Sequence, residues 1–180
     1  MDQAEVNNNT MVQAANTDTA GRKYQRSGRD RRVADRRAAA VPVADGDLDT
    51  LTGLYNLDAW NRVLEVEDER CKRYGHTSCI VAVELGGLKM ASAHLICRAG
   101  LAIRFVMKER DFVARVGPEK FAALVAESNA GASGRVVQRI RTALGKAGVV
   151  ASVGVAMRLP EKGLQYAYRE ACRAKQYRVP

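Results

Sequence analysis

Two glutamates, Glu84 and Glu119, have the residue type and the positions to do chemistry together. Glu84 stands near the end of an apolar run, and Glu119 stands in the tip of a predicted hairpin. Functional groups concentrate where loops leave a rigid scaffold, so we expect both carboxylates at one edge of a sheet. Carboxylates together with substrate phosphates are what Mg²⁺ usually binds, which gives a magnesium pair as one interpretation. The alternative is two solvated carboxylates paired with nearby lysines, Lys89 or Lys120.

Apolar periodicity predicts the elements that must position these side chains. Helical spacing with an N-cap at Asn56 predicts a helix over 57–74, and the β-branched run "SCIVAVEL" predicts a buried strand over 78–85. "DFVARV" and "KFAALVAES" predict the two strands of the hairpin. Further apolar patterns predict a helix around Leu95–Val106, a helix around Val136–Leu144, a strand within 148–157 and a helix around Leu164–Ala174.

The order of these elements predicts the fold class. It reads helix, strand, helix, hairpin, helix, strand, helix, and a central hairpin between helical crossovers favours one sheet covered by helices. We therefore expect an α+β sandwich with a mixed, mainly antiparallel sheet of the palm or ferredoxin-like kind. We assign this domain to residues 47–180.

Residues 1–46 are predicted to be a disordered tail, because they lack hydrophobic periodicity and are rich in polar residues. Within the tail, residues 21–37 hold eight Lys or Arg against two Asp, a local charge of +6 out of +9 for the whole chain. Such a tract favours non-specific binding to nucleic acid, anionic surfaces or acidic partners. Its arginines include Arg29, Arg31, Arg32, Arg36 and Arg37.

The remaining bulk features exclude several classes of protein. No apolar run approaches the roughly 20 residues of a membrane span, and no signal-like segment opens the chain, so we expect a cytoplasmic protein. The four cysteines form no C-x-x-C pair, which favours reduced, packed thiols over zinc or disulfides. Arg135 and Arg139 are interpreted as part of a solvated helix face.

Five stretches follow one another along the chain, namely "DTLTGLYN", "VAVELGGLK", "DFVARVGPEKF", "ASVGVA" and "AYREACRAK". Together they resemble the motifs of the GGDEF family of bacterial diguanylate cyclase domains. "DTLTGLYN" is similar to the entry motif D-x-L-T-G-L-x-N, "VAVELGGLK" lies where the family has D-h-D-x-F-K, and "DFVARVGPEKF" lies in the place of the signature hairpin. "ASVGVA" and "AYREACRAK" are similar to the last strand and last helix motifs. The resemblance covers about residues 47–178.

The resemblance implies roles for the signature residues Gly117, Pro118, Glu119, Lys120 and Phe121. In the family, two GTP molecules condense to cyclic di-GMP with the help of metal ions, and the metal carboxylates fall on Glu84 and Glu119. Pro118 replaces a glycine that lets the nucleotide approach, and it lacks an N–H donor. Lys120 replaces an acidic residue. The guanine-reading positions fall on about Ser92 and Leu101.

Further positions carry over from the family's binding sites. The product-binding motif R-x-x-D falls on Lys108 and Asp111, where Lys lacks the bidentate fork of Arg. Lys89, Lys175 and Arg178 are candidates for phosphate contacts. The spacing R-R-x-x-x-R-R in the tail resembles the arginine motif of PilZ-type cyclic di-GMP receptors, although the barrel that follows it in those proteins has no counterpart here.

We therefore predict a catalytically degenerate GGDEF-like domain that acts in bacterial cyclic di-GMP signalling by binding a protein partner or a nucleotide. The protein partner would be a second copy or another signalling protein, and the nucleotide would be GTP or cyclic di-GMP. No cofactor is expected, and Mg²⁺ would bind only with residual GTP. The alternatives are a weak diguanylate cyclase and a cyclic di-GMP receptor that uses Lys108 and Asp111 or the arginine tract.

Overall fold

A computed structural model describes residue 44, residues 46–86 and residues 91–175 of the chain. The chain divides into the units Met1–Pro42 and Val43–Pro180, and the described residues all belong to the second. The predicted disordered tail, apart from residues 44 and 46, lies outside the described residues, as do the basic tract, Lys89 and Arg178.

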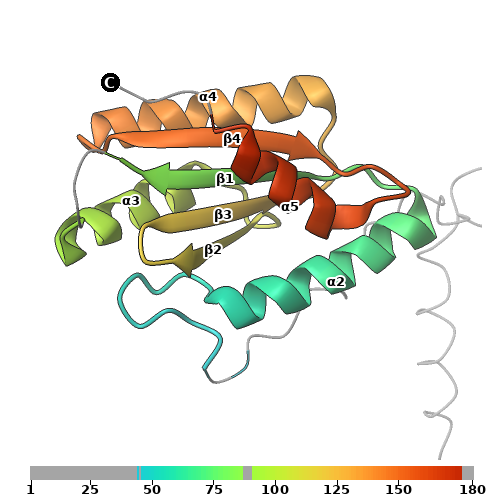
Figure 1. The fold of residues 1–180 in the computed structure, drawn as a ribbon, viewed down its shortest axis with the longest axis horizontal. Helices are drawn as coiled ribbons and strands as arrows, with labels where there is room; N and C mark the ends of the chain where they lie inside the picture. Colours follow the sequence, from blue (N-terminus) through green and yellow to red (C-terminus); the bar gives the residue numbers. More distant parts are fainter. Residues whose placement is uncertain (1–43, 45, 87–90, 176–180) are drawn as a thin grey trace, which may run out of the picture. The chain divides into compact units, whose positions relative to one another are not determined.

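The described elements follow the predicted order. They are α2 (Leu57–Tyr74), β1 (Cys79–Leu85), α3 (Ala93–Val106), β2 (Phe112–Gly117), β3 (Lys120–Val125), α4 (Ala130–Lys146), β4 (Ala151–Met157) and α5 (Gly163–Arg173), and Figure 1 shows their arrangement. The predicted last helix ends one residue early, because Ala174 is the C-cap of α5.

Helix α2 shows why the sequence fixes its own bounds so closely. The side chain of Asn56 accepts a hydrogen bond from the N–H of Ala59, which satisfies a donor left free at the helix start. At the other end, Gly75 adopts the left-handed conformation, with φ of 66°, and its N–H returns to the carbonyl of Cys71. The predicted helix over 57–74 and its N-cap are both confirmed.

The sheet has the strand order β2-β3-β1-β4, and every pair of neighbouring strands is antiparallel. Among the described residues, the one parallel pairing is an isolated bridge between Tyr55 and Ala114. The predicted α+β fold with a mainly antiparallel sheet is therefore confirmed, and its parallel component is confined to this bridge.

The two faces of the sheet are covered by different helices. Val81 and Val83 of β1 join Ile103 of α3 and Ile140 of α4 in one buried apolar cluster. Side chains alternate along a strand, so Glu84 lies on the opposite face. That face is covered by α2 and α5, and Figure 1 shows α5 crossing in front of β4.

The cysteines are unpaired, as predicted. Cys71 and Cys79 are buried, whereas Cys97 and Cys172 are partly exposed. Burial raises the pKa of the Cys71 and Cys79 thiols, so both stay protonated at neutral pH. Within the described residues, no helix combines the length and the apolar character that a membrane span requires.

Candidate functional site

The hairpin tip is held in place by Arg115. One guanidinium nitrogen donates to the carbonyl of Pro118 at 2.8 Å, and the other donates to a carboxylate oxygen of Asp49 at 2.9 Å. The second oxygen of Asp49 accepts from both the backbone N–H and the hydroxyl of Thr52. The "DTLTGLYN" segment therefore anchors the signature loop through one arginine.

Glu84 is surrounded by cations. In the sheet register it faces Lys120 on β3, whose ammonium lies 3.7 Å from one carboxylate oxygen. The other oxygen accepts a hydrogen bond from Lys175, just beyond α5. The hydrogen bond from Lys175 is the main cause that lowers the pKa of Glu84 below its usual value of 4.5. The predicted pairing of Glu84 with a neighbouring lysine is thus observed.

Glu119 is turned to a different partner. One of its carboxylate oxygens accepts the backbone N–H of Ala91 at 2.5 Å, while its own carbonyl accepts from Leu85 at 3.0 Å. Across residue 44 and the ranges 46–86 and 91–175, no group of three or more metal-ligating side chains comes together. Because Glu84 is bound by ammonium groups and Glu119 by an amide, these residues do not fit a divalent ion as they stand.

A change at Lys175 should move the pKa of Glu84 upward. In the variant Lys175→Met, the carboxylate loses its main stabilising partner, so we expect it to titrate at a higher pH than in the natural chain, as followed by carbon NMR of Glu84. Lys146→Met, on the distant helix α4, is the matched control and should leave Glu84 unchanged. An unmoved titration in Lys175→Met would contradict the observed pairing.

The same pair gives a small pH dependence of stability. A carboxyl whose folded pKa is depressed stabilises the fold above its unfolded value, here about 4.5, and this contribution disappears as the pH falls through the folded value. Because the Glu84 carboxylate is 37% exposed, the contribution is under about 1 kcal/mol.

The positions aligned with guanine recognition have other uses. Ser92 is the N-cap of α3 and accepts from the N–H of Leu95 at 3.3 Å. Leu101 is 67% exposed on the outer side of α3, and Phe105, one turn further on, is 87% exposed. Leu carries no polar group to pair with a guanine edge. This part of α3 therefore presents apolar side chains to the solvent.

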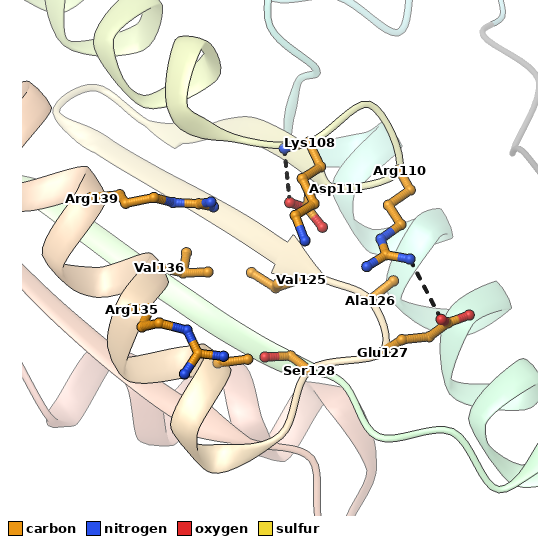
Figure 2. A pocket seen from close by; sticks show the side chains of 11 residues that line it. Lys108, Arg110, Asp111, Val125, Ala126, Glu127, Ser128, Arg135, Val136 and Arg139 are labelled. Atoms are coloured by element: carbon orange, nitrogen blue, oxygen red, sulfur yellow. Dashed lines mark hydrogen bonds and ion pairs between the residues drawn. The ribbon is translucent and has the colours of Figure 1, made fainter.

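A second site lies at the far end of the hairpin. An open pocket of about 90 Å³ is lined by the segment Lys108–Asp111, by residues 125–128 after β3 and by one side of α4. Figure 2 shows that two arginines, Arg135 and Arg139, reach toward it from α4, while Lys108 and Arg110 come from the opposite rim. The pocket therefore concentrates four cationic side chains.

Asp111 lies in the wall of this pocket. It is 6% exposed, and one carboxylate oxygen accepts the backbone N–H of Lys108 at 2.9 Å. Its other oxygen is buried and has no hydrogen-bond partner. Burial is the largest effect on this carboxyl and raises its pKa above the usual 3.8. The nearby charges of Arg110, Lys108 and Arg139 act in the opposite direction and favour the carboxylate.

The structure brings together some predicted residues and adds others. Lys108 and Asp111 share the pocket as the motif implies, whereas Glu84 and Lys175 form a separate cluster at the other end of the strands. The sequence analysis missed the pocket roles of Arg110, Glu127, Arg135 and Arg139. Arg135 and Arg139 are indeed exposed, but their spacing of four residues on α4 also places both at the pocket.

The fold and the signature hairpin define a GGDEF-type domain, and comparisons with known proteins agree. The family model "Diguanylate cyclase, GGDEF domain" matches residues 46–167. The chain belongs to this family. A search of curated protein sequences found no match.

Three solved structures with a similar fold are distant in sequence. The GGDEF domain of DgcB from Caulobacter crescentus, solved with c-di-GMP, is 21% identical with a TM-score of 0.68 over 76% of this chain and 89% of that one. The diguanylate cyclase SiaD from Pseudomonas aeruginosa, solved with its activator SiaC, is 23% identical with a TM-score of 0.67, covering 81% of this chain but 60% of SiaD. The FimX GGDEF domain from Pseudomonas aeruginosa is 20% identical with a TM-score of 0.65 over 72% and 91%.

Proposed function

We propose that this chain is a GGDEF domain that acts by binding and not by condensing GTP. The observation that carries the proposal is the state of Glu84, whose two oxygens face the ammonium groups of Lys175 and Lys120. A carboxylate that binds a metal ion must donate oxygen lone pairs to it, and here two ammonium groups compete for the same oxygens. The positive charge that a metal ion would place beside Glu84 is already supplied by Lys175 and Lys120.

Pro118 supports the same proposal from the backbone. A proline at the hairpin tip offers no N–H to a phosphate, and its ring restricts how closely a nucleotide can approach. Its carbonyl is also engaged by Arg115, so the tip is held in its present shape. Removing a donor that a bound nucleotide needs costs roughly 1–3 kcal/mol of affinity for each lost partner.

The test is an incubation of the purified full chain with GTP and Mg²⁺, followed by chromatography of the nucleotides. We expect no cyclic di-GMP above the amount formed by the variant Glu119→Ala, with an active diguanylate cyclase run in parallel as the positive control. Steady accumulation of cyclic di-GMP that disappears in Glu119→Ala would make the chain a weak cyclase and overturn the proposal.

The basic pocket favours cyclic di-GMP as the ligand of such a binding domain. Its four cations suit the two phosphates of a cyclic dinucleotide. The DgcB domain of similar fold was solved with c-di-GMP. Calorimetry of the full chain with cyclic di-GMP tests this, and the absence of any binding heat removes the receptor function.

A protein partner is the second candidate ligand. It is favoured by the exposure of Leu101 and Phe105 on α3, because large apolar side chains grouped on a surface commonly mark interaction sites. SiaD was solved with its activator SiaC, so proteins that contain this fold can take protein partners. Sedimentation of the natural chain beside a Leu101→Ser, Phe105→Ser variant tests self-association, and equal molar masses would exclude this face as a dimer contact.

A further inference from the structure

Besides Asp111, a second acidic side chain lines the basic pocket, and it is paired with one of the pocket's cations. A carboxylate oxygen of Glu127 lies 3.5 Å from a guanidinium nitrogen of Arg110, and both residues line the pocket. Figure 2 shows the two side chains meeting at the side of the pocket away from α4, with Arg110 from the loop before β2 and Glu127 from the turn after β3. An anion that approaches Arg110 therefore meets a carboxylate that is already paired with it.

The backbone of Glu127 is also unusual. Its φ is 53°, and it is the only residue other than glycine with a positive φ among the described residues. Glycine, Asn or Asp is the usual choice for this left-handed conformation, and Glu is not. A residue in such a strained conformation persists only where the surrounding structure holds it, and such residues are commonly found at functional sites. From this backbone position the Glu127 side chain meets Arg110 at the edge of the pocket (Figure 2).

We propose that Glu127 is an internal competitor that occupies Arg110 until an anionic ligand displaces it. This inference rests on the proposed binding of cyclic di-GMP at the same pocket. A phosphate must replace the carboxylate at Arg110, so Glu127 lowers the affinity and sets a higher ligand concentration for occupancy. It also favours ligands that carry more than one negative charge, since these gain from the other cations while they displace Glu127.

Asp111 does not have this role, although it is the other carboxylate of the pocket. It is 94% buried and is fixed by the N–H of Lys108, so it cannot move aside for a ligand. The Glu127 side chain is 23% exposed and lies at the pocket rim, where its oxygens can turn to water when Arg110 is taken. Asp111 is therefore a fixed part of the pocket wall, whereas the carboxylate of Glu127 can be displaced.

The test is calorimetric titration of the full chain and of Glu127→Gln with cyclic di-GMP at one ionic strength. Glu127→Gln should bind about two- to fivefold more tightly, the size expected when a partly exposed ion pair stops competing. Glu109→Gln is the matched control, because it removes the same charge from the neighbouring loop without lining the pocket, and it should bind as the natural chain does. Circular dichroism melts check that each variant is folded.

The mechanism is checked in a second background. If Glu127 acts through Arg110, the gain from Glu127→Gln should vanish when both chains also carry Arg110→Gln, and a persisting gain overturns the inference. Equal affinities of the natural chain and Glu127→Gln also overturn it while leaving the receptor function intact. No binding by either chain removes both. If Glu127→Gln does not fold, Glu127→Gly removes the same carboxylate together with the backbone strain and decides between the same outcomes.

Discussion

Replacing Gly154 by alanine is expected to lower the free energy of unfolding by about 3 kcal/mol, the upper end of the range for overpacking a core. A β-carbon at this position would lie 2.1 Å from the carbonyl oxygen of Ala171 and 3.0 Å from backbone atoms of Ala174 and Lys175. All three contacts are to backbone atoms, which cannot relieve the clash by a change of rotamer. Helix α5 would therefore have to move away from β4.

The displacement should also reach the candidate site. Gly154 supports the end of α5, and Lys175 follows directly with its ammonium on Glu84. A shift of α5 would separate this pair, so the pKa of Glu84 should rise toward its usual value in any folded Gly154→Ala protein. The glycine in the "ASVGVA" strand thus serves to bring a cation to the end of β1.

Urea denaturation and thermal melting measure the stability part of this prediction. A loss of about 3 kcal/mol should lower the melting temperature by about 10 °C in a domain of this size. The matched control is Gly134→Ala on α4, where a β-carbon meets nothing within 4 Å and where alanine should raise the stability by about 0.5–1 kcal/mol. Similar melting temperatures for the two variants would show that α5 does not pack on β4 as described.

The sequence predicts most of the fold because its local signals agree with one another. Asn56 and Gly75 mark both ends of α2, and the β-branched run of β1 is flanked by turn residues, so each element is specified by caps as well as by apolar spacing. The order of elements and the five motifs then leave one fold class. Register and the close contact at Gly154 depend on side-chain packing, which no local signal carries.

The candidate site is less predictable for the same physical reason. The pairing of Glu84 with a lysine could be expected, because Lys120 stands near the hairpin tip and pairs across the strands. That Lys175 also reaches Glu84 depends on how α5 lies over β4, a contact between residues 91 positions apart. The basic pocket likewise joins three segments, so a pattern within any one of them could not show it.

Arg135 and Arg139 illustrate this limit directly. Their positions along α4, opposite the apolar stripe of Val136 and Ile140, predict a solvated polar face. Both arginines are indeed exposed. Their role comes from what faces them across the pocket, the loop that carries Lys108 and Asp111. Exposure and function are therefore compatible here, and only the tertiary structure distinguishes these arginines from ordinary surface charges.

The double variant Arg135→Ala, Arg139→Ala is expected to lose about 100-fold in affinity for cyclic di-GMP. A hydrogen bond to a charged group contributes about 1.5–3 kcal/mol, and each factor of ten in affinity corresponds to about 1.4 kcal/mol, so two such contacts give this loss even after screening by solvent at an open pocket. Calorimetry at constant salt measures the effect. Both arginines are exposed, so the variant should melt at the same temperature as the natural chain.

Two further variants locate the cyclic di-GMP site within the chain. Lys146→Ala removes a cation from the same helix but outside the pocket, and it should bind as the natural chain does. Replacing Arg31, Arg32, Arg36 and Arg37 by alanine tests the tail tract in the same way. Unchanged affinity in the Arg135, Arg139 double variant, with affinity lost in the tail variant, would assign the nucleotide to the tract. Affinity lost in the Arg135, Arg139 double variant and kept in the tail variant would place the nucleotide in the pocket. The double variant removes two pocket cations and changes no other cation of the chain.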